Sequence, residues 1–199
     1  MNDPTRFADP GYAWYDLATQ FVVHCPKCDG KAWVKTKEEG QKLVCTACFH
    51  VEMPGHWYGA MTAYVSVKCR ECHASLSRSA PWDGHWKKLA MHCDQCGDDC
   101  EYEASISRHY LHKGLMCDAV FGLPLWLQKT FRGDRFWAFH YEHLTLLEQY
   151  IAASHRERGI SPRNSISKNS AVFSRLPAFM TKAGNRAELL KLIGFLAKK

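Results

Sequence analysis

Eight of the ten cysteines fall into four Cys-x-x-Cys pairs. Thiolates at the two ends of such a pair bind one metal ion together, and two pairs complete the tetrahedral shell that zinc prefers. Sixteen residues separate the first pair from the second and twenty separate the third from the fourth, a spacing typical of four-cysteine zinc sites. The sequence therefore predicts two zinc ions per chain, one bound by Cys25, Cys28, Cys45 and Cys48 and the other by Cys69, Cys72, Cys93 and Cys96.

Other potential ligands lie close to these pairs. Cys100 follows the last pair by four positions, and His50, His73 and His92 lie beside or near a pair. With four thiolates already in each set, we expect surface histidines and a Cys100 that packs in a strand with Tyr102, although replacement of a ligand stays open. Redox chemistry is disfavoured because it needs one pair at the start of a helix in a βαβ unit. Closed four-thiolate sites leave no position for water, so both sites are expected to be structural.

Short strands must position the ligands. Residues 31–35 and 41–44 have the composition of strands and flank a Glu-Glu-Gly turn, which predicts a zinc-ribbon hairpin between the first two pairs. The second unit repeats the spacing at an offset of 44 residues, with residues 79–86 inserted in its loop. Gly30 and Gly97 follow pairs at points where the backbone must turn its amides towards sulfur. Duplication of one ribbon explains both units.

The second half of the chain has a hairpin pattern followed by helical periodicity. Residues 123–128 and 136–139 are apolar and flank a polar turn that contains Gly133, which predicts a β-hairpin. From Tyr141 to Ile151 the apolar residues recur at helical spacing, and we expect this helix to continue to a basic last turn that ends before Gly159.

The last forty residues are expected to hold a hinge and two helices. Residues 161–170 are polar and aperiodic, which predicts a flexible connection. Pro177 suits the first turn of a short helix that stops at Gly184. Asn185 and Glu188 have the spacing of a capping box at the start of a terminal helix that reaches about residue 196.

These elements define an α+β fold class: two tandem four-cysteine zinc ribbons, built as β-hairpins, followed by a β-hairpin and a helical C-terminal region. Five segments are predicted: an N-terminal lead (1–20), the first ribbon (21–66), the second ribbon (67–112), the hairpin with its amphipathic helix (113–160), and a polar hinge with basic terminal helices (161–199).

Positive charge is concentrated at one end of the chain. The formal net charge is +6, yet residues 154–199 alone hold ten bases and two acids, while the two ribbons come to +1 and −1. A basic segment of this kind is typical of contact with nucleic-acid phosphates, although a solvated basic face is an equally simple interpretation. The candidate nucleic-acid-binding residues are Arg156, Arg158, Arg163, Lys168, Arg175, Lys182 and Arg186.

Two functions are therefore weighed for a non-enzymatic zinc-binding module. The first is a nucleic-acid-binding accessory protein that contacts DNA or RNA through the basic C-terminal segment. The alternative is a protein-binding adaptor, for example a toxin-neutralising or complex-assembly protein, whose ribbons display aromatic anchors to a protein partner. The anchors would be Trp57, Tyr58, Trp82 and Trp86.

Motif absences and the N-terminal sequence restrict the remaining classes. His140-Tyr141-Glu142-His143 fits neither metalloprotease nor deaminase spacing, and phosphate-loop, dinucleotide and nucleophile-elbow motifs are absent, so no enzyme activity or small-molecule substrate is expected. The string is expected to be a helix N-terminus. The N-terminus does not resemble a secretory signal, and no apolar stretch approaches the roughly 20 residues of a membrane span. A cytoplasmic location is expected, where the cysteines remain reduced.

Several short strings in residues 123–186 carry a resemblance to a known group of proteins. They are Leu-Pro-Leu-Trp-Leu-Gln from Leu123, Phe-Trp-Ala from Phe136, His143-Leu144, Tyr150-Ile151, Leu176-Pro177 and Asn185-Arg186. Together with the cysteine pairs, they make the chain similar to uncharacterised bacterial tandem zinc-ribbon proteins, with TFIIB-like or helicase-type ribbons and a shared C-terminal segment. The resemblance implies zinc ribbons and no helicase motor. His140 departs from it, because a helix-capping asparagine is expected there, and so does the long second-ribbon loop with Trp82 and Trp86.

Overall fold

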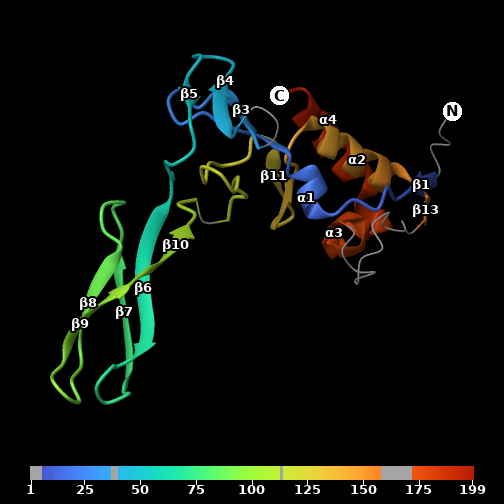
Figure 1. The fold of residues 1–199 in the computed structure, drawn as a ribbon. Coiled ribbons are helices and arrows are strands. Elements are labelled where there is room, and N and C mark those ends of the chain that lie inside the picture. The colour runs from blue at the N-terminus through green and yellow to red at the C-terminus, as the bar shows by residue number, and fades with distance from the viewer. Residues whose placement is uncertain (1–5, 37–39, 113, 158–171) are drawn as a thin grey trace. The chain divides into compact units, whose positions relative to one another are not determined.

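The computed structural model describes residues 6–36, 40–112, 114–157 and 172–199, so the predicted hinge at 161–170 lies outside the described residues. The chain divides into two compact units (Figure 1). Unit 1 comprises Met1–Pro54 and Gly114–Lys199, and unit 2 comprises Gly55–Lys113. The first cysteine ribbon therefore belongs to the same unit as the C-terminal region, a grouping that the linear order of the predicted segments did not suggest.

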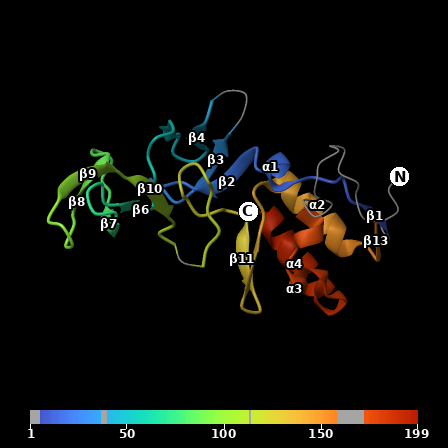
Figure 2. The same ribbon diagram turned by 60° about the horizontal axis from the view of Figure 1, so that its bottom comes forward.

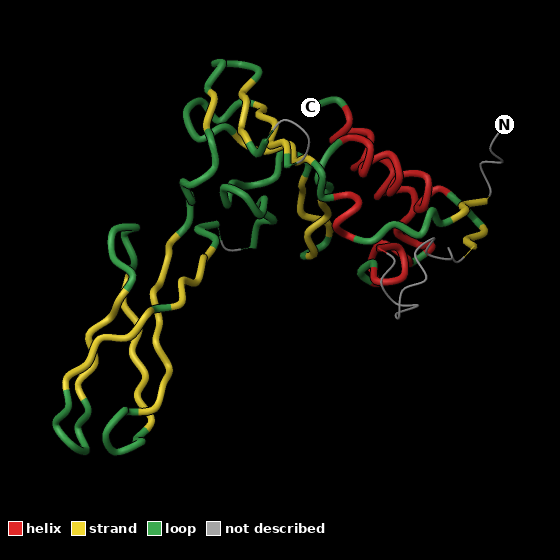
Figure 3. Tube along the Cα trace, in the orientation of Figure 1, coloured by secondary structure: helices red, strands yellow, loops and turns green. Residues whose placement is uncertain are grey.

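Strands in hairpin sheets make up most of the regular structure, and all helices of the described residues lie in unit 1 (Figure 3). This agrees with the predicted mixture of hairpins and a C-terminal helix.

A four-stranded antiparallel sheet carries the first pair of cysteine knuckles. It runs in the order β2 (Gln20–His24), β3 (Lys31–Lys35), β4 (Lys42–Cys45) and β5 (Val51–Glu52). The first knuckle lies in the β2–β3 turn and the second in the β4–β5 turn. The β3–β4 hairpin is the one predicted from residues 31–35 and 41–44, and its alternating Ala32, Val34 and Leu43 are fully buried.

The outer edge of β2 is covered by residues from the second half of the chain. The amide of Val22 donates to the Phe139 carbonyl at 2.7 Å, and the amide of Trp126 donates to the Val22 carbonyl at 2.8 Å. Val23 also forms an isolated antiparallel bridge with Leu125. The three central residues of β2, Phe21 to Val23, are all buried rather than alternating, so both faces of this strand are covered as well as both edges.

A buried carboxylate shapes the loop that leads to this edge. Asp118 is fully buried, and its two oxygens accept hydrogen bonds from the amides of Val120, Phe121 and Leu123 at 2.7 to 2.8 Å. Burial raises the pKa of Asp118, while these amides act in the opposite direction. The loop that these hydrogen bonds close places Pro124 and Leu125 beside β2.

The predicted second hairpin is formed by β11 (Gln128–Phe131) and β12 (Asp134–Trp137). Its turn consists of Arg132 and Gly133, both with positive φ, which is the two-residue turn that matches the twist of a hairpin. Residues 123–127, which were expected in the first strand, instead run along β2.

The helical core of unit 1 is built on α2 (Tyr141–Ala152) and α4 (Arg186–Ala197), with the short helices α1 (Trp14–Leu17) and α3 (Ala178–Thr181) around it. Two 3-10 turns cover Val172–Arg175 and Ala183–Asn185. In addition, β1 (Arg6–Ala8) pairs in parallel with β13 (His155–Glu157). The apolar stripes of both long helices are buried in one cluster, with Leu144, Leu147, Ile151, Leu189, Ile193 and Leu196.

Three predicted helix ends are wrong. The α2 helix stops at Ala152 and has no basic last turn, because Arg156 lies in β13 and donates from Nε to the Tyr150 carbonyl at 3.1 Å. The capping box at Asn185 is not formed, since its amide nitrogen donates to the Phe179 carbonyl and its oxygen accepts from Arg132. The helix after Pro177 ends at Thr181, and Gly184 lies in the following 3-10 turn.

Unit 2 consists of two small sheets (Figure 2). In the first, β6 (Ala60–Lys68) lies between β7 (Ser75–Pro81) and β10 (Ser105–His109). In the second, β8 (Lys88–His92) pairs with β9 (Asp99–Glu103). The predicted boundary between residues 66 and 67 falls inside β6, because this strand pairs with β7 through to Lys68.

The second ribbon does not repeat the strand pairing of the first. In unit 1 the strands between the two knuckles, β3 and β4, pair with each other, whereas the corresponding β7 and β8 belong to different sheets. The Arg78 side chain, which donates to the Ala90 carbonyl, connects β7 with β8 instead. The repeat expected from the cysteine spacing is therefore seen in the knuckles and not in the pairing of the strands between them.

Candidate metal centres

The first set of four cysteines converges on one point. The Sγ atoms of Cys25 and Cys48 are 3.7 Å apart and those of Cys28 and Cys45 are 3.6 Å apart. All four Sγ atoms lie within 4.8 Å of one another. Cys25 and Cys45 are buried, while Cys28 and Cys48 face solvent.

The second set has the same geometry. The Sγ atoms of Cys69 and Cys96 are 3.6 Å apart, and those of Cys72 and Cys93 are 3.5 Å apart. A zinc ion with Zn–S bonds of about 2.3 Å in a tetrahedron separates its sulfurs by about 3.8 Å. Both sets fit such an ion closely. In the part of the chain that the structure describes, these two sets are the groups able to hold a metal.

A common backbone pattern builds all four knuckles. The amide of the first cysteine donates to the carbonyl five residues later, at 2.8 to 2.9 Å, in every pair. The residue directly after the second cysteine has positive φ in every pair: Asp29, Phe49, His73 and Gly97. Gly97 has this positive φ in the fourth knuckle. In the first knuckle Asp29 has it instead, and Gly30, the next residue, donates its amide to the Cys28 sulfur as expected.

Backbone amides point at the sulfurs within each knuckle. The amides of Ala47 and Cys48 both donate to Cys45 Sγ at 3.4 Å. Burial acts to raise the pKa of the Cys45 thiol, but these amides, together with hydrogen bonds from the Cys48 and Cys25 thiols, lower the pKa to about 6. Amide donation from Cys96 and Gln95 likewise lowers the pKa of Cys93 to about 7. Preformed amide donors of this kind favour the thiolate that a metal binds.

Gly30 has a steric role beside the first site. A methyl group at this position would lie 3.0 Å from Ala47 Cβ and 3.2 Å from Cys28 Sγ. Because these atoms belong to two facing knuckles, Gly30→Ala is expected to push the knuckles apart and lower zinc affinity by about tenfold, as overpacking by one methyl group commonly does. Chelator competition measures the effect. Gly194→Ala, where the added methyl meets open space, is the matched control, and an equal loss in both variants would contradict the steric role.

None of the spare ligands joins either set. Cys100 donates from its thiol to Asp98 at 3.0 Å and shares β9 with Tyr102. His50 contacts Glu52 at 3.0 Å, and His92 contacts Asp99 at 2.8 Å.

Two carboxylates that lie near the metal sites were not identified from the sequence. Asp29 and Asp99 each lie 2.8 Å from the Nδ1 atom of the histidine that directly precedes a knuckle, His24 and His92 respectively. The repeated His-Cys-x-x-Cys order, with an aspartate one to three residues later, is a signal that could have identified them.

The seven candidate nucleic-acid residues do not form one exposed set. Arg158, Arg163 and Lys168 lie outside the described residues. Arg156 donates to the carbonyls of Tyr150 and Thr181, and Arg186 donates to the Ala153 carbonyl at 3.1 Å. These two guanidinium groups hold unit 1 together. Arg175 and Lys182 are exposed.

The four ribbon aromatics differ in exposure. Trp57 is only 6% exposed, and its indole donates to the His109 carbonyl at 3.2 Å. Tyr58 is half-buried against the His56 ring, with the ring centroids 4.4 Å apart. Trp82 and Trp86 are half-buried as well, and the Trp82 indole donates to the Trp86 carbonyl. Trp57 therefore belongs to the interior of unit 2, while the other three side chains are partly accessible.

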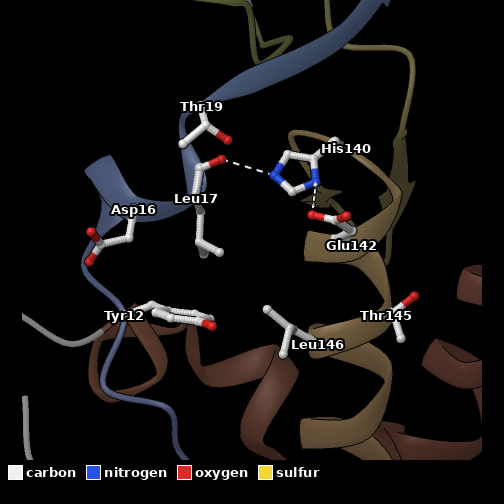
Figure 4. A pocket seen from close by; sticks show the side chains of 8 residues that line it. All are labelled: Tyr12, Asp16, Leu17, Thr19, His140, Glu142, Thr145 and Leu146. Carbon is white, nitrogen blue, oxygen red and sulfur yellow. Dashed lines mark hydrogen bonds and ion pairs between the residues drawn. The ribbon is translucent and has the colours of Figure 1, made fainter. Parts of the chain in front are cut away.

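A cavity of about 370 Å³ lies between α1 and the start of α2 (Figure 4). His140, which is 3% exposed, donates from Nε2 to the Leu17 carbonyl at 2.9 Å and accepts from the His143 amide through Nδ1. It therefore caps α2 in the position where the resemblance leads one to expect asparagine. Because both ring nitrogens are hydrogen-bonded, His140 fixes the start of α2 against α1. The cavity is lined by Tyr12, Asp16, Leu17, Thr19, His140, Glu142, Thr145 and Leu146.

Comparison with protein-family models, curated proteins and solved structures finds no match for this chain. Among the helices that the structure describes, none has both the length and the apolar composition needed to cross a membrane. The two four-thiolate clusters are thus the features that suit this chain to metal binding, and zinc is the ion that their donor set fits best.

Proposed function

We propose that this chain is a non-enzymatic zinc-binding module that acts as a nucleic-acid-binding accessory protein in the cytoplasm. It would belong with the tandem zinc-ribbon proteins that it resembles. The distribution of charge carries the proposal. Unit 2 holds seven bases and seven acids, so the whole formal charge of +6 lies in unit 1, and residues 154–199 within it come to +8. A localised positive charge of this size is what a phosphate backbone attracts.

The closed metal sites support a structural role for zinc. Each site already has four sulfur ligands, which leaves no coordination position for a substrate or a water molecule. A reducing compartment keeps such thiols available to the metal. In this proposal the ribbons are scaffold, and the contact with DNA or RNA falls to exposed bases of unit 1.

The alternative function, a protein-binding adaptor, is favoured by one observation on the first ribbon. Phe49, Val51 and Met53 are 81%, 55% and 61% exposed, and they alternate along the second knuckle and the edge strand β5. Phe49 also has a positive φ of 58°, an unfavourable conformation for a bulky residue. An exposed apolar row on β5, the last strand of its sheet among the described residues, suits a protein partner better than a phosphate backbone.

Salt dependence separates the two functions. The full zinc-loaded chain is titrated with a labelled oligothymidine and with a random duplex at two salt concentrations. The nucleic-acid function predicts binding whose logarithmic salt slope is about −0.7 for each phosphate contact on a single strand. Absence of binding to both probes at low salt would reject the nucleic-acid function and leave the adaptor as the better proposal.

A further inference from the structure

The outward face of α4 exposes an aromatic side chain between two lysines. The helix buries Leu189, Ile193 and Leu196, whereas Lys191, Phe195 and Lys198 recur at i, i+4 and i+7 on the opposite, exposed side. Phe195 is 53% exposed. Since the other large apolar residues of α4 are buried or pack against the core, the exposure of Phe195 is not explained by the needs of the core.

A third lysine reaches this aromatic ring from the neighbouring hairpin. Lys129, an exposed residue of β11, places its Nζ atom 4.0 Å from the centroid of the Phe195 ring. The contact links β11 with the C-terminal turn of α4. Lys129, Lys191, Phe195 and Lys198 are called the lysine–phenylalanine patch below.

Two further lysines continue the positive surface towards the first ribbon. Lys199 places Nζ 4.4 Å above the Trp126 ring and donates to the Trp126 carbonyl at 3.0 Å. Lys31 of β3 donates to the Lys199 carbonyl at 3.4 Å and lies over the Tyr141 ring. Burial lowers the pKa of Lys199, and the charge of Lys129 adds to this while Asp29 opposes it.

Two carboxylates near this surface are engaged with other partners. Glu188, one turn before Lys191 on α4, forms an ion pair with Arg132. Asp29, the acid whose charge acts on Lys199, also lies 2.8 Å from His24. Lysines that repel one another around an accessible aromatic ring favour a ligand that has both negative charge and a flat apolar face.

We infer that the lysine–phenylalanine patch binds single-stranded nucleic acid, with the three lysines on phosphates and Phe195 stacked on a base. This inference rests on the proposed nucleic-acid function and assigns its surface. Single strands are favoured over duplexes because a base inside a duplex is already stacked on both faces and cannot offer one to Phe195. The patch differs from the seven arginines and lysines named from sequence, of which Arg156 and Arg186 hold unit 1 together.

The first test compares two double charge reversals in the full zinc-loaded chain. Lys191→Glu with Lys198→Glu alters the patch, and Arg175→Glu with Lys182→Glu makes the same change of charge at other exposed positions of residues 154–199. Binding of labelled oligothymidine is measured by fluorescence anisotropy. The patch variant should lose about tenfold or more in affinity at low salt, and its salt slope should flatten by about 1.4. The control variant should retain most of the affinity and the slope.

The second test isolates the aromatic ring. Phe195→Leu keeps an apolar side chain but removes the stacking surface, so affinity should fall roughly 5- to 100-fold with an unchanged salt slope. Phe195→Trp, which keeps an aromatic ring, should bind about as tightly as the unaltered chain. Because Phe195 is exposed, the circular dichroism of both variants should match that of the unaltered chain.

The outcomes separate the inference from the function on which it rests. If the unaltered chain fails to bind oligothymidine and duplex alike, both fail together. If it binds but the two charge-reversal variants weaken equally, the patch is overturned while the nucleic-acid function stands. If Phe195→Leu binds as tightly as the unaltered chain, or if duplex competes as well as single strand, the stacking role is overturned.

Discussion

Removal of zinc by a chelator at neutral pH, with a reductant present, should unfold unit 2 while the helical core of unit 1 stays folded. Hydrogen exchange followed by mass spectrometry would show loss of protection in β6 to β9, with protection retained in α2 and α4. Elemental analysis before chelation should find two zinc ions per chain.

The difference between the units follows from their cores. The buried apolar cluster of unit 2 consists of Val65, Leu89 and Met91, with partly buried neighbours. The cluster around α2 and α4 in unit 1 contains eighteen buried residues. With so small a core, unit 2 is expected to need an additional link to fold, and a structural zinc supplies about 10–16 kcal/mol.

The position of the second site makes that link necessary. Cys69 and Cys72 lie in the β6–β7 turn, whereas Cys93 and Cys96 lie in the β8–β9 turn. One metal ion would thus clamp two sheets that do not pair with each other. In unit 1 the knuckles are also held by the β3–β4 ladder and by the covered edge of β2.

Single ligand substitutions test this reasoning. Cys72→Ser should remove one zinc ion and unfold unit 2, while Cys28→Ser, the matched change in the first site, should remove one ion and leave α2 and α4 protected. If chelation exposes the helices and unit 2 together, the units are coupled and the argument from separate cores is wrong. If chelation leaves unit 2 protected, the metal has no structural role there.

Features that are set by residues close together in the sequence could be predicted, whereas features set by residues far apart could not. The eight metal ligands could be named because knuckle geometry is set within five residues, by the amide of each first cysteine and a carbonyl close by. The buried stripe of α2 was equally accessible, since it depends on period alone. The pairing of β7 with β6 instead of β8 was not, because nothing local in these strands selects the partner.

Helix ends were missed where distant groups competed with local ones. Asn185 has the sequence of a helix cap, but the Phe179 carbonyl and Arg132 take both ends of its side chain. Arg156 looks like the basic end of a helix, yet its guanidinium satisfies carbonyls of Tyr150 and Thr181. Tertiary hydrogen bonds of this kind override local propensity and leave no trace in composition.

The packing of α4 also decides how charge should be tested. Because Leu189, Ile193 and Leu196 are buried in the main cluster of unit 1, truncation of the chain within residues 161–170 would remove part of that core along with the basic residues. Loss of binding after truncation would then report unfolding as readily as lost charge. Substitution of exposed bases avoids this ambiguity.

Acid should destabilise unit 1 through His143, the second large effect that the structure predicts. This histidine is 1% exposed, its Nδ1 accepts the amide of Phe139 at 3.2 Å, and the rings of Trp14 and Trp137 pack against it. Burial lowers the pKa of His143 from 6.5 to about 3, and the nearby His140 adds to this effect. In the described structure the Nε2 atom of His143 is buried without a hydrogen-bond partner, so a charged ring would be poorly stabilised there.

Below pH 6.5 the unfolded chain takes up a proton at His143, whereas the folded chain does so only near pH 3. The full contribution of neutral His143 to the free energy of unfolding is therefore present above pH 6.5. It is lost as the pH falls, by about 1.4 kcal/mol for each pH unit. Urea unfolding followed by helical circular dichroism measures this slope. His143→Asn keeps a hydrogen-bond acceptor for Phe139 and should be less stable at pH 7 but flatter between pH 4 and 6.5.

His155→Asn, a change at an exposed histidine of the same unit, is the control for this slope and should titrate like the unaltered chain. Acid also protonates cysteine thiolates and releases zinc, but that loss is common to all three proteins and cancels in the comparison. Only the difference between His143→Asn and the other two therefore reports on the buried ring. Equal slopes in all three proteins would mean that the folded chain tolerates a charged His143. The aromatic rings around it would then have to move apart in acid with little loss of stability.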